Sequence, residues 1–218
     1  MKKNLTELVF ILDKSGSMQR LTEDTIGGFN SMIEKQKKEE GDAFVTTVLF
    51  SGKHTILHDH VNIHEVSPMT DKEYFASGST ALLDAVGDTI NTIGNRLNNT
   101  PEEEKPEKVI FIITTDGQEN SSNEFNKETV KEMIEHQQEK YSWLFMFLGA
   151  NIDAVSEASN LGINTEYART YTASSAGTDS LYASVSNAIT YARGTSSNAG
   201  GWTTQAASEI SKALDEIK

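Results

Sequence analysis

The chain contains no cysteine, which excludes disulfide bonds, thiolate catalysis and metal sites built on sulfur. It has only 3 prolines among its 218 residues, and no apolar run approaches the roughly 20 residues that span a membrane. Basic residues are outnumbered by acidic ones, since 19 Lys and Arg stand against 32 Asp and Glu, giving a formal net charge of −13. A surface of that charge opposes non-specific nucleic-acid binding, which depends on neutralising phosphates. We therefore expect neither a nucleic-acid partner nor a membrane partner.

The start of the chain lacks the body of a secretion signal. Met1-Lys2-Lys3 supplies the charge of a signal peptide, but the following apolar run is confined to residues 8–12 and no small-residue cleavage site comes after it. We therefore expect a cytoplasmic protein, with which the absence of cysteine agrees. With 37% hydrophobic and 23% charged residues, the chain has the composition of one sizeable globular domain.

Short apolar runs alternate along the chain with segments of helical periodicity. The runs predict buried strands at residues 8–12, 43–50, 109–114 and 143–148, and a last edge strand at 167–171. Helical spacing predicts helices at residues 22–40, 81–97, 127–140, 153–161 and 180–193. After a tight turn at Ser51-Gly52, residues 55–61 predict an antiparallel edge strand. This alternation is typical of an α/β fold with a mainly parallel sheet.

The last part of the chain differs in composition. Residues 194–201 are rich in Gly, Ser and Asn, which predicts a flexible connection. Residues 203–218 carry apolar side chains at helical spacing, which predicts a C-terminal amphipathic helix. We therefore divide the chain into a main domain of residues 1–193 and an extension of residues 194–218.

Three loops carry the oxygen ligands that a hard divalent cation prefers. They supply Asp13, Ser15 and Ser17 after the first strand, Thr80 in a small-residue loop before the helix at 81–97, and Asp116 after the strand at 109–114. Gly16 between the two serines is expected to let the backbone turn sharply. Because ligands sit at the carboxyl ends of strands in open α/β sheets, we expect the five side chains to meet there. Two carboxylates and three hydroxyls suit Mg²⁺, with Mn²⁺ or Ca²⁺ also admitted.

The ordered set Asp-x-Ser-Gly-Ser, Gly-Ser-Thr and Thr-Asp-Gly resembles the von Willebrand factor A (VWA) domain family. The metal-ion-dependent adhesion site (MIDAS) of that family matches Asp13, Ser15, Ser17, Thr80 and Asp116 in order. The resemblance covers residues 6–193 and implies a Rossmann-like open sheet with helices on both faces and one antiparallel edge strand. It also implies that the serines bind the metal directly, while the aspartates and the threonine exchange direct and water-mediated contact.

The function that this resemblance implies is protein–protein interaction. One coordination position of the metal is left for a partner's carboxylate, so we expect a protein partner that presents an Asp or Glu. No residue selects a particular partner or an oligomeric state. The richness in lysine and asparagine is typical of bacterial or phage proteins.

Two other functions stay open. A magnesium-dependent phosphohydrolase of the haloacid dehalogenase type also has an Asp after its first strand, but it needs a second Asp where this chain has Ser15. A metal-independent scaffold would use the C-terminal helix as its contact surface. At the level of single motifs, Asp-x-Ser-Gly-Ser is compatible with a plain turn and Thr80 with a helix cap. Glu119 and Asn120, which follow the Asp116 turn, either line the metal face or are solvent-facing loop residues, and we favour the second interpretation.

Four histidines lie close together in the chain. In an uninterrupted strand they would share one face, and a face of histidines suits zinc or copper. The alternative, which we favour, is the polar outer side of an edge strand with apolar residues facing inward. The histidines are His54, His58, His60 and His64, and the inward-facing residues are Leu57, Val61 and Ile63.

Overall fold

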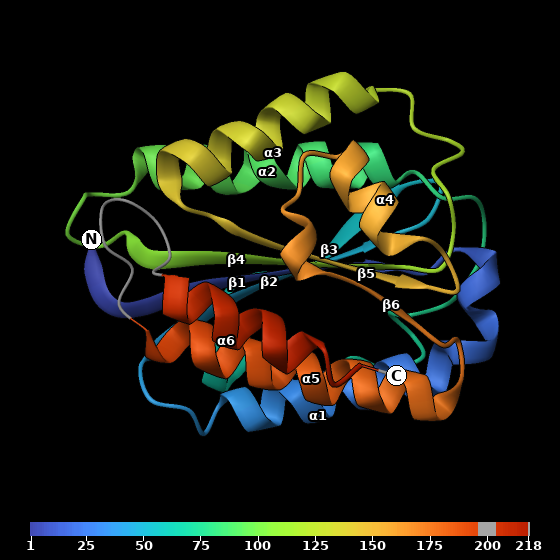
Figure 1. Ribbon diagram of the computed structural model, residues 1–218, viewed down its shortest axis with the longest axis horizontal. Helices are drawn as coiled ribbons and strands as arrows, with labels where there is room; N and C mark the ends of the chain where they lie inside the picture. The colour runs from blue at the N-terminus through green and yellow to red at the C-terminus, as the bar shows by residue number, and fades with distance from the viewer. Residues whose placement is uncertain (196–203, 218) are drawn as a thin grey trace.

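The computed structural model describes residues 1–195 and 204–217, which form a six-stranded sheet with helices on both faces (Figure 1). The strands are β1 (Lys2–Asp13), β2 (Asp42–Phe50), β3 (His54–Asn62), β4 (Pro106–Thr115), β5 (Leu144–Ala150) and β6 (Ala168–Tyr171). Their order in the sheet is β3-β2-β1-β4-β5-β6. All neighbours pair in parallel except β3, which runs antiparallel to β2 at the edge. The predicted Rossmann-like α/β fold is therefore confirmed.

Two layers of helices cover the sheet (Figure 1). On one face lie α1 (Thr22–Gln36), α5 (Ser175–Gly194) and α6 (Thr204–Leu214), and on the other lie α2 (Leu82–Asn99), α3 (Lys127–Tyr141) and α4 (Ala154–Asn160). Three short 3₁₀ helices accompany them: η1 (Gly16–Leu21), η2 (Ile63–Glu65) and η3 (Thr165–Tyr167). None of the helices in the described residues is long and apolar enough to cross a membrane.

The central strand β1 shows why the apolar runs are continuous. Its Leu8 and Phe10 pack in the core beneath α1 and α5, whereas Val9 and Ile11 pack in the core beneath α2. A parallel strand covered on both faces has no polar side, so hydrophobic residues follow one another without alternation. The edge strand β3 is exposed on part of its surface and is accordingly more polar.

Two helices begin or end away from their predicted bounds. The helix α1 stops at Gln36, because residues 37–41 form turns that lead into β2. The helix α5 begins at Ser175, where the Ser174 side chain accepts a hydrogen bond from Gly177 N at 3.1 Å. That N-cap lies in a run of small polar residues, which conceals the helix start from periodicity.

The C-terminal helix α6 is part of the same core as α1 and α5. Ile210 and Leu214 are fully buried there. Arg169 of β6 donates to Asp215 Oδ1 at 2.8 Å and to Ser211 Oγ at 3.0 Å, which ties α6 to the edge of the sheet. Of the predicted connection at residues 194–201, residues 196–201 lie outside the described part, and the division after residue 193 stays a prediction.

A close approach of α1 and α5 explains one of two adjacent glycines in α1. A Cβ atom on Gly28 would lie 2.2 Å from Cδ2 of Tyr182, whereas a Cβ on Gly27 would meet nothing within 4 Å. Glycine weakens a helix interior, so Gly28 is explained by packing and Gly27 is not.

Candidate metal centre

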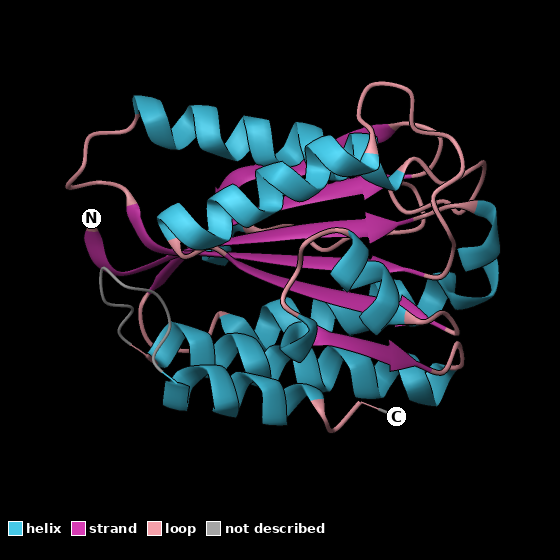
Figure 2. Cartoon of the chain, turned by 45° about the horizontal axis from the view of Figure 1, so that its top comes forward, coloured by secondary structure: helices cyan, strands magenta, loops and turns pink. Residues whose placement is uncertain are grey.

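The three predicted loops meet at the end of the sheet toward which the arrowheads of the parallel strands point (Figure 2). The loop before α2 runs along the loop after β1, since Ser77 N donates to Lys14 O at 2.8 Å and Gly16 N donates to Gly78 O at 3.0 Å. The chain turns into the helix η1 at Gly16, and the left-handed backbone at this junction is at Gly78, whose φ is +83°. The contacts therefore bring two of the three motifs side by side.

Four of the predicted oxygens form one group. Ser15 Oγ lies 3.1 Å from Ser17 Oγ, and the Ser17 hydroxyl donates to Asp116 Oδ1 at 2.5 Å. Thr80 Oγ1 lies on the same side of Gly117 as this group, because a Cβ atom on Gly117 would lie 3.2 Å from it and 3.8 Å from Ser17 Oγ. A side chain at position 117 would therefore crowd the hydroxyls of both Thr80 and Ser17.

Asp13 lies directly behind this group and is fully buried. Its Oδ1 accepts a hydrogen bond from Ser15 N at 2.7 Å, and its Oδ2 accepts one from the Thr115 hydroxyl at 2.6 Å. Burial raises the pKa of the Asp13 carboxyl, although the hydrogen bonds from Thr115 and Ser15 oppose the rise. A cation next to this carboxyl would favour its charged form.

The donor set matches the chemistry of a hard divalent cation. Octahedral Mg²⁺ holds oxygen ligands at about 2.1 Å, which places adjacent ligands about 3 Å apart, as Ser15 Oγ and Ser17 Oγ are. In the described part of the chain, no group of three or more His, Asp and Glu side chains is arranged to hold a metal. The candidate centre is instead a mixed set of two carboxylates and three hydroxyls, and its binding of a metal stays a prediction.

Sequence reasoning missed the residues that connect the Thr80 loop to the Asp116 loop. Asn120 Oδ1 accepts from Thr80 N at 2.9 Å, and Asn120 N donates to Thr80 O at 3.0 Å. Glu119 does not simply face solvent as expected, because it accepts from Leu83 N at 2.9 Å, in the first turn of α2. A Glu that caps a helix 36 positions away leaves no local signal in the sequence.

The Glu119 carboxylate and the Ser122 hydroxyl, and not Thr80, accept the free N–H groups at the start of α2. The N-cap residue Ala81 makes no side-chain cap bond, and Glu119 accepts from Leu83 N in its place. Burial on its own would raise the pKa of Glu119, but hydrogen bonds from Leu83, Ser122 and Ser121 together bring it below its ordinary value.

Asp84 ties the other end of this loop to α2. Its carboxylate accepts from the backbone N–H groups of Asn123, Glu124 and Phe125, each at 2.9 Å. These bonds outweigh the effect of burial and lower the pKa of Asp84. The whole segment after Asp116 is therefore fastened to α2.

The predicted face of histidines does not form. Two register shifts interrupt the pairing of β2 with β3, so alternation along the strand is broken. His58 is buried beside Phe29, with Nδ1 3.0 Å from Thr47 Oγ1 and Nε2 3.0 Å from Ser67 O. The expectation that the histidines line the outer side of the strand is thus wrong for His58.

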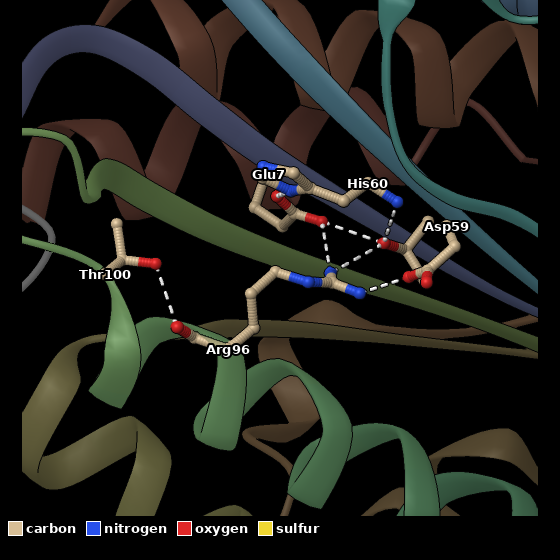
Figure 3. A network of polar contacts seen from close by, with 6 residues as sticks. Glu7, Asp59, His60, Arg96 and Thr100 are labelled. Atoms are coloured by element: carbon tan, nitrogen blue, oxygen red, sulfur yellow. Dashed lines mark hydrogen bonds and ion pairs between the residues drawn. The ribbon is translucent and has the colours of Figure 1, made fainter.

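His60 lies on the opposite side of the sheet, in a network of polar side chains (Figure 3). Its φ is +53°, its ring stacks on Phe44 with centroids 4.0 Å apart, and its Nδ1 lies 2.7 Å from Glu7 Oε2. Glu7 is fully buried and also accepts from the Thr46 hydroxyl at 2.8 Å, while Arg96 pairs with both Glu7 and Asp59. These contacts account for His60 without a metal.

Comparison with known proteins gives the fold. No protein-family model matches the chain, and no curated protein matches it in sequence. Proximal thread matrix protein 1 from the mussel byssus aligns with a TM-score of 0.58 and 19% identity over 87% of this chain and 47% of its own. The manganese-loaded TRAP protein of Plasmodium vivax aligns with a TM-score of 0.57 and 18% identity over 79% of this chain and 70% of its own.

A von Willebrand factor type A structure from Catenulispora acidiphila aligns over 98% of this chain and 43% of its own, with a TM-score of 0.54 and 14% identity. The chain thus spans about half the length of the mussel and Catenulispora chains. The chain therefore has the fold of these solved structures, one of which is a von Willebrand factor type A structure, and this is the fold that the resemblance of its motifs predicts.

Proposed function

We propose that the protein is a metal-dependent protein-interaction module. Asp13, Ser15, Ser17, Thr80 and Asp116 hold a divalent cation, Mg²⁺ in the first place, with Mn²⁺ or Ca²⁺ as alternatives. When bound, the cation supplies an electrophilic position that the Asp or Glu of a partner protein fills. The observation that carries the proposal is the contact of Ser15 with Ser17 and of Ser17 with Asp116, which joins two loops 99 positions apart.

The charges of the group support this proposal. Two carboxylates offset a divalent charge, and three neutral hydroxyls leave the ion attractive to a further carboxylate. Two of the similar structures also support a divalent cation. The TRAP protein is described as manganese-loaded, and one structure of the mussel protein is described as having a zinc-occupied MIDAS motif.

Catalysis as a phosphohydrolase is the weaker alternative. A nucleophilic Asp13 would have to reach a phosphate ester from solution, yet its side chain is fully buried. Ser15 occupies the position of the general acid and has no useful acidity near neutral pH. Surface hollows of about 370 and 680 Å³ lie beside α3, and their lining residues do not belong to the three loops.

The alternative of a scaffold that binds through α6 is also less favoured. The apolar side chains of α6 that would contact a partner are already buried in the core: Ala206, Ile210, Ala213 and Leu214. We further propose that the protein acts in the cytoplasm and binds neither nucleic acid nor membranes, which its net charge of −13 and its lack of cysteine support.

Calorimetric titration of Mg²⁺ and Mn²⁺ into the full chain tests the proposal. Asp116→Asn and Ser17→Ala are expected to weaken metal binding at least about tenfold, the loss of one charged or directly bound ligand. Glu139→Gln removes one exposed charge from α3 and serves as the control. Equal heats for all four proteins would overturn the metal site.

Asp13→Asn distinguishes binding from catalysis. Unlike alanine, asparagine keeps an acceptor for Ser15 N, so the loop is expected to stay folded while metal affinity falls. Turnover of p-nitrophenyl phosphate with Mg²⁺, present in the wild type and lost in Asp13→Asn, would favour the phosphohydrolase instead.

A further inference from the structure

Phe75 is the most exposed large hydrophobic side chain in the described part of the chain, at 67%. The residue before it, Tyr74, is fully buried, and its hydroxyl donates to the backbone carbonyl of Asp13. Phe75 therefore projects to solvent from a backbone whose preceding side chain contacts the first residue of the candidate metal centre.

Hydrogen bonds on both sides hold the backbone around Phe75. On the N-terminal side, Tyr74 N donates to Thr70 O at 2.9 Å and the Thr70 hydroxyl donates to Glu73 Oε2 at 2.6 Å, which closes a tight turn. On the C-terminal side, Ser77 N donates to Lys14 O at 2.8 Å. Lys14 Nζ also donates to Glu73 O at 3.4 Å, so both ends of residues 73–77 contact the residue between Asp13 and Ser15.

The exposed ring of Phe75 does not stabilise the isolated protein. An apolar ring in water is unfavourable in proportion to its exposed area, and Phe75 belongs to neither core cluster. Because its backbone is already fixed, little conformational entropy is lost when a partner covers it. A rigid, exposed aromatic residue is the kind of side chain on which binding energy concentrates at interfaces.

The charge of the chain adds a second argument. A net charge of −13 repels a strongly acidic partner over the Debye length, which is about 8 Å at physiological salt. Further acidic residues would therefore weaken a partner that brings a carboxylate to the metal, whereas an apolar contact adds affinity without charge repulsion. Phe75 is an exposed apolar side chain in the segment whose two ends contact Lys14.

Resting on the proposed function, we propose that Phe75 is an apolar anchor beside the metal centre. The partner is a protein segment in which a bulky apolar side chain lies next to the Asp or Glu that binds the cation. Its carboxylate completes the metal shell, and its apolar side chain packs on the ring of Phe75.

A displayed library of random peptides, bound to the full chain in Mg²⁺ and eluted with EDTA, tests this inference. The wild type is expected to enrich peptides with an acidic residue adjacent to Leu, Phe, Trp or Met. Phe75→Ser is expected to keep the acidic residue and lose the apolar neighbour. Ile56→Ser removes an apolar side chain that is 45% exposed on β3, and it is expected to select the wild-type pattern.

Each failure has its own signature. Enrichment of acidic residues without apolar neighbours, or the same pattern with Phe75→Ser, overturns the anchor and leaves the metal site standing. If no peptide is enriched in a way that depends on Mg²⁺ and on Asp116, both the proposed function and the anchor are overturned.

The affinity of a synthetic peptide from the selection measures how much Phe75 contributes to binding. Phe75→Ser is expected to weaken its binding about tenfold or more, with the affinity for Mg²⁺ alone unchanged. Replacing the peptide's apolar residue by Ser should remove most of that difference, as a double-mutant cycle requires for a direct contact. A Phe75-dependent dimer in sedimentation, or Phe75-dependent binding to phosphatidylcholine–phosphatidylserine vesicles, would assign the surface to another occupant and overturn the inference.

Discussion

Asn120 and Thr80 are joined by two hydrogen bonds, although they lie 40 positions apart in the chain. The Thr80 N–H donates to the side-chain oxygen of Asn120 at 2.9 Å, and the Asn120 N–H donates to the Thr80 carbonyl at 3.0 Å. Since Asn120 follows Asp116 closely, the pair fixes the loop of one candidate ligand against the loop of another. The contacts of Asn120 thus help to set the distance between the Thr80 hydroxyl and the Asp116 carboxylate in the protein without a bound ion.

We therefore expect Asn120→Ala to weaken Mg²⁺ binding about three- to tenfold, the equivalent of one hydrogen bond. The side chain of Asn120 would act only by positioning Thr80. Asn123→Ala is the matched control, because that side chain bonds to Ser121 O within its own loop. Calorimetry measures both affinities, and an Asn120→Ala protein that binds Mg²⁺ as tightly as the wild type would refute the positioning role.

The two carboxylates that fasten the loop to α2 predict how stability depends on pH. Asp84 and Glu119 have folded-state pKa values below their ordinary values of 3.8 and 4.5. Their contribution is therefore fully present above about pH 4.5 and is lost as the pH falls through the lower folded-state values. At pH 7 we expect Asp84→Asn with Glu119→Gln to cost about 1–2 kcal/mol per residue, as for a lost N-cap.

Urea unfolding at a series of pH values checks this expectation. The difference in unfolding free energy between the wild type and the double variant should shrink steadily below pH 4.5. Glu139→Gln, on the exposed side of α3, should follow the wild type throughout. A difference that stays constant down to acid unfolding would mean that the two carboxylates do not titrate as the hydrogen bonds imply.

The sheet could be predicted because its central strands are buried on both faces. The strands β1, β4 and β5 carry unbroken apolar runs, and each ends at a polar loop that marks the carboxyl end of the strand. Parallel strands place those loops at one edge, which is why the group around Ser17 and Asp116 could be anticipated. That the group binds a metal ion stays a prediction.

What could not be predicted depends on contacts between distant segments. Glu119 caps a helix that begins well before it in the chain, so no spacing rule relates the two. His60 takes a left-handed backbone where the pairing of β3 with β2 is irregular, and nothing in the local sequence marks that shift. Side chains alternate between the two faces of a strand only while its pairing is regular, so the alternation fails where the pairing of β3 with β2 is interrupted.

The buried Glu7 is expected to matter for stability and not for metal binding. Glu7→Ala removes the acceptor of Thr46 and the partner of His60 and Arg96, which we expect to cost about 3 kcal/mol. Asp59→Ala is the comparison, because this exposed partner of Arg96 should contribute less than about 1 kcal/mol. Urea unfolding measures both values, and similar costs for the two would contradict the importance of burial.

The two adjacent glycines of α1 are expected to respond in opposite directions to the same substitution. Gly27→Ala places its Cβ in open space and should stabilise the protein by about 0.5–1 kcal/mol, because alanine loses less backbone entropy in a helix. Gly28→Ala places its Cβ 2.2 Å from the ring of Tyr182 and should destabilise the protein by about 1–3 kcal/mol through overpacking.

Thermal or urea unfolding of the two variants provides a test in which each is the other's control. Both remove the same glycine entropy from the same helix, so the difference between them isolates the contact of α1 with α5. Pairing Gly28→Ala with Tyr182→Leu should recover part of the loss, because the smaller side chain vacates the space that the new Cβ enters. Equal effects of the two glycine variants would show that α1 and α5 do not approach as closely as the contact of Gly28 with Tyr182 requires.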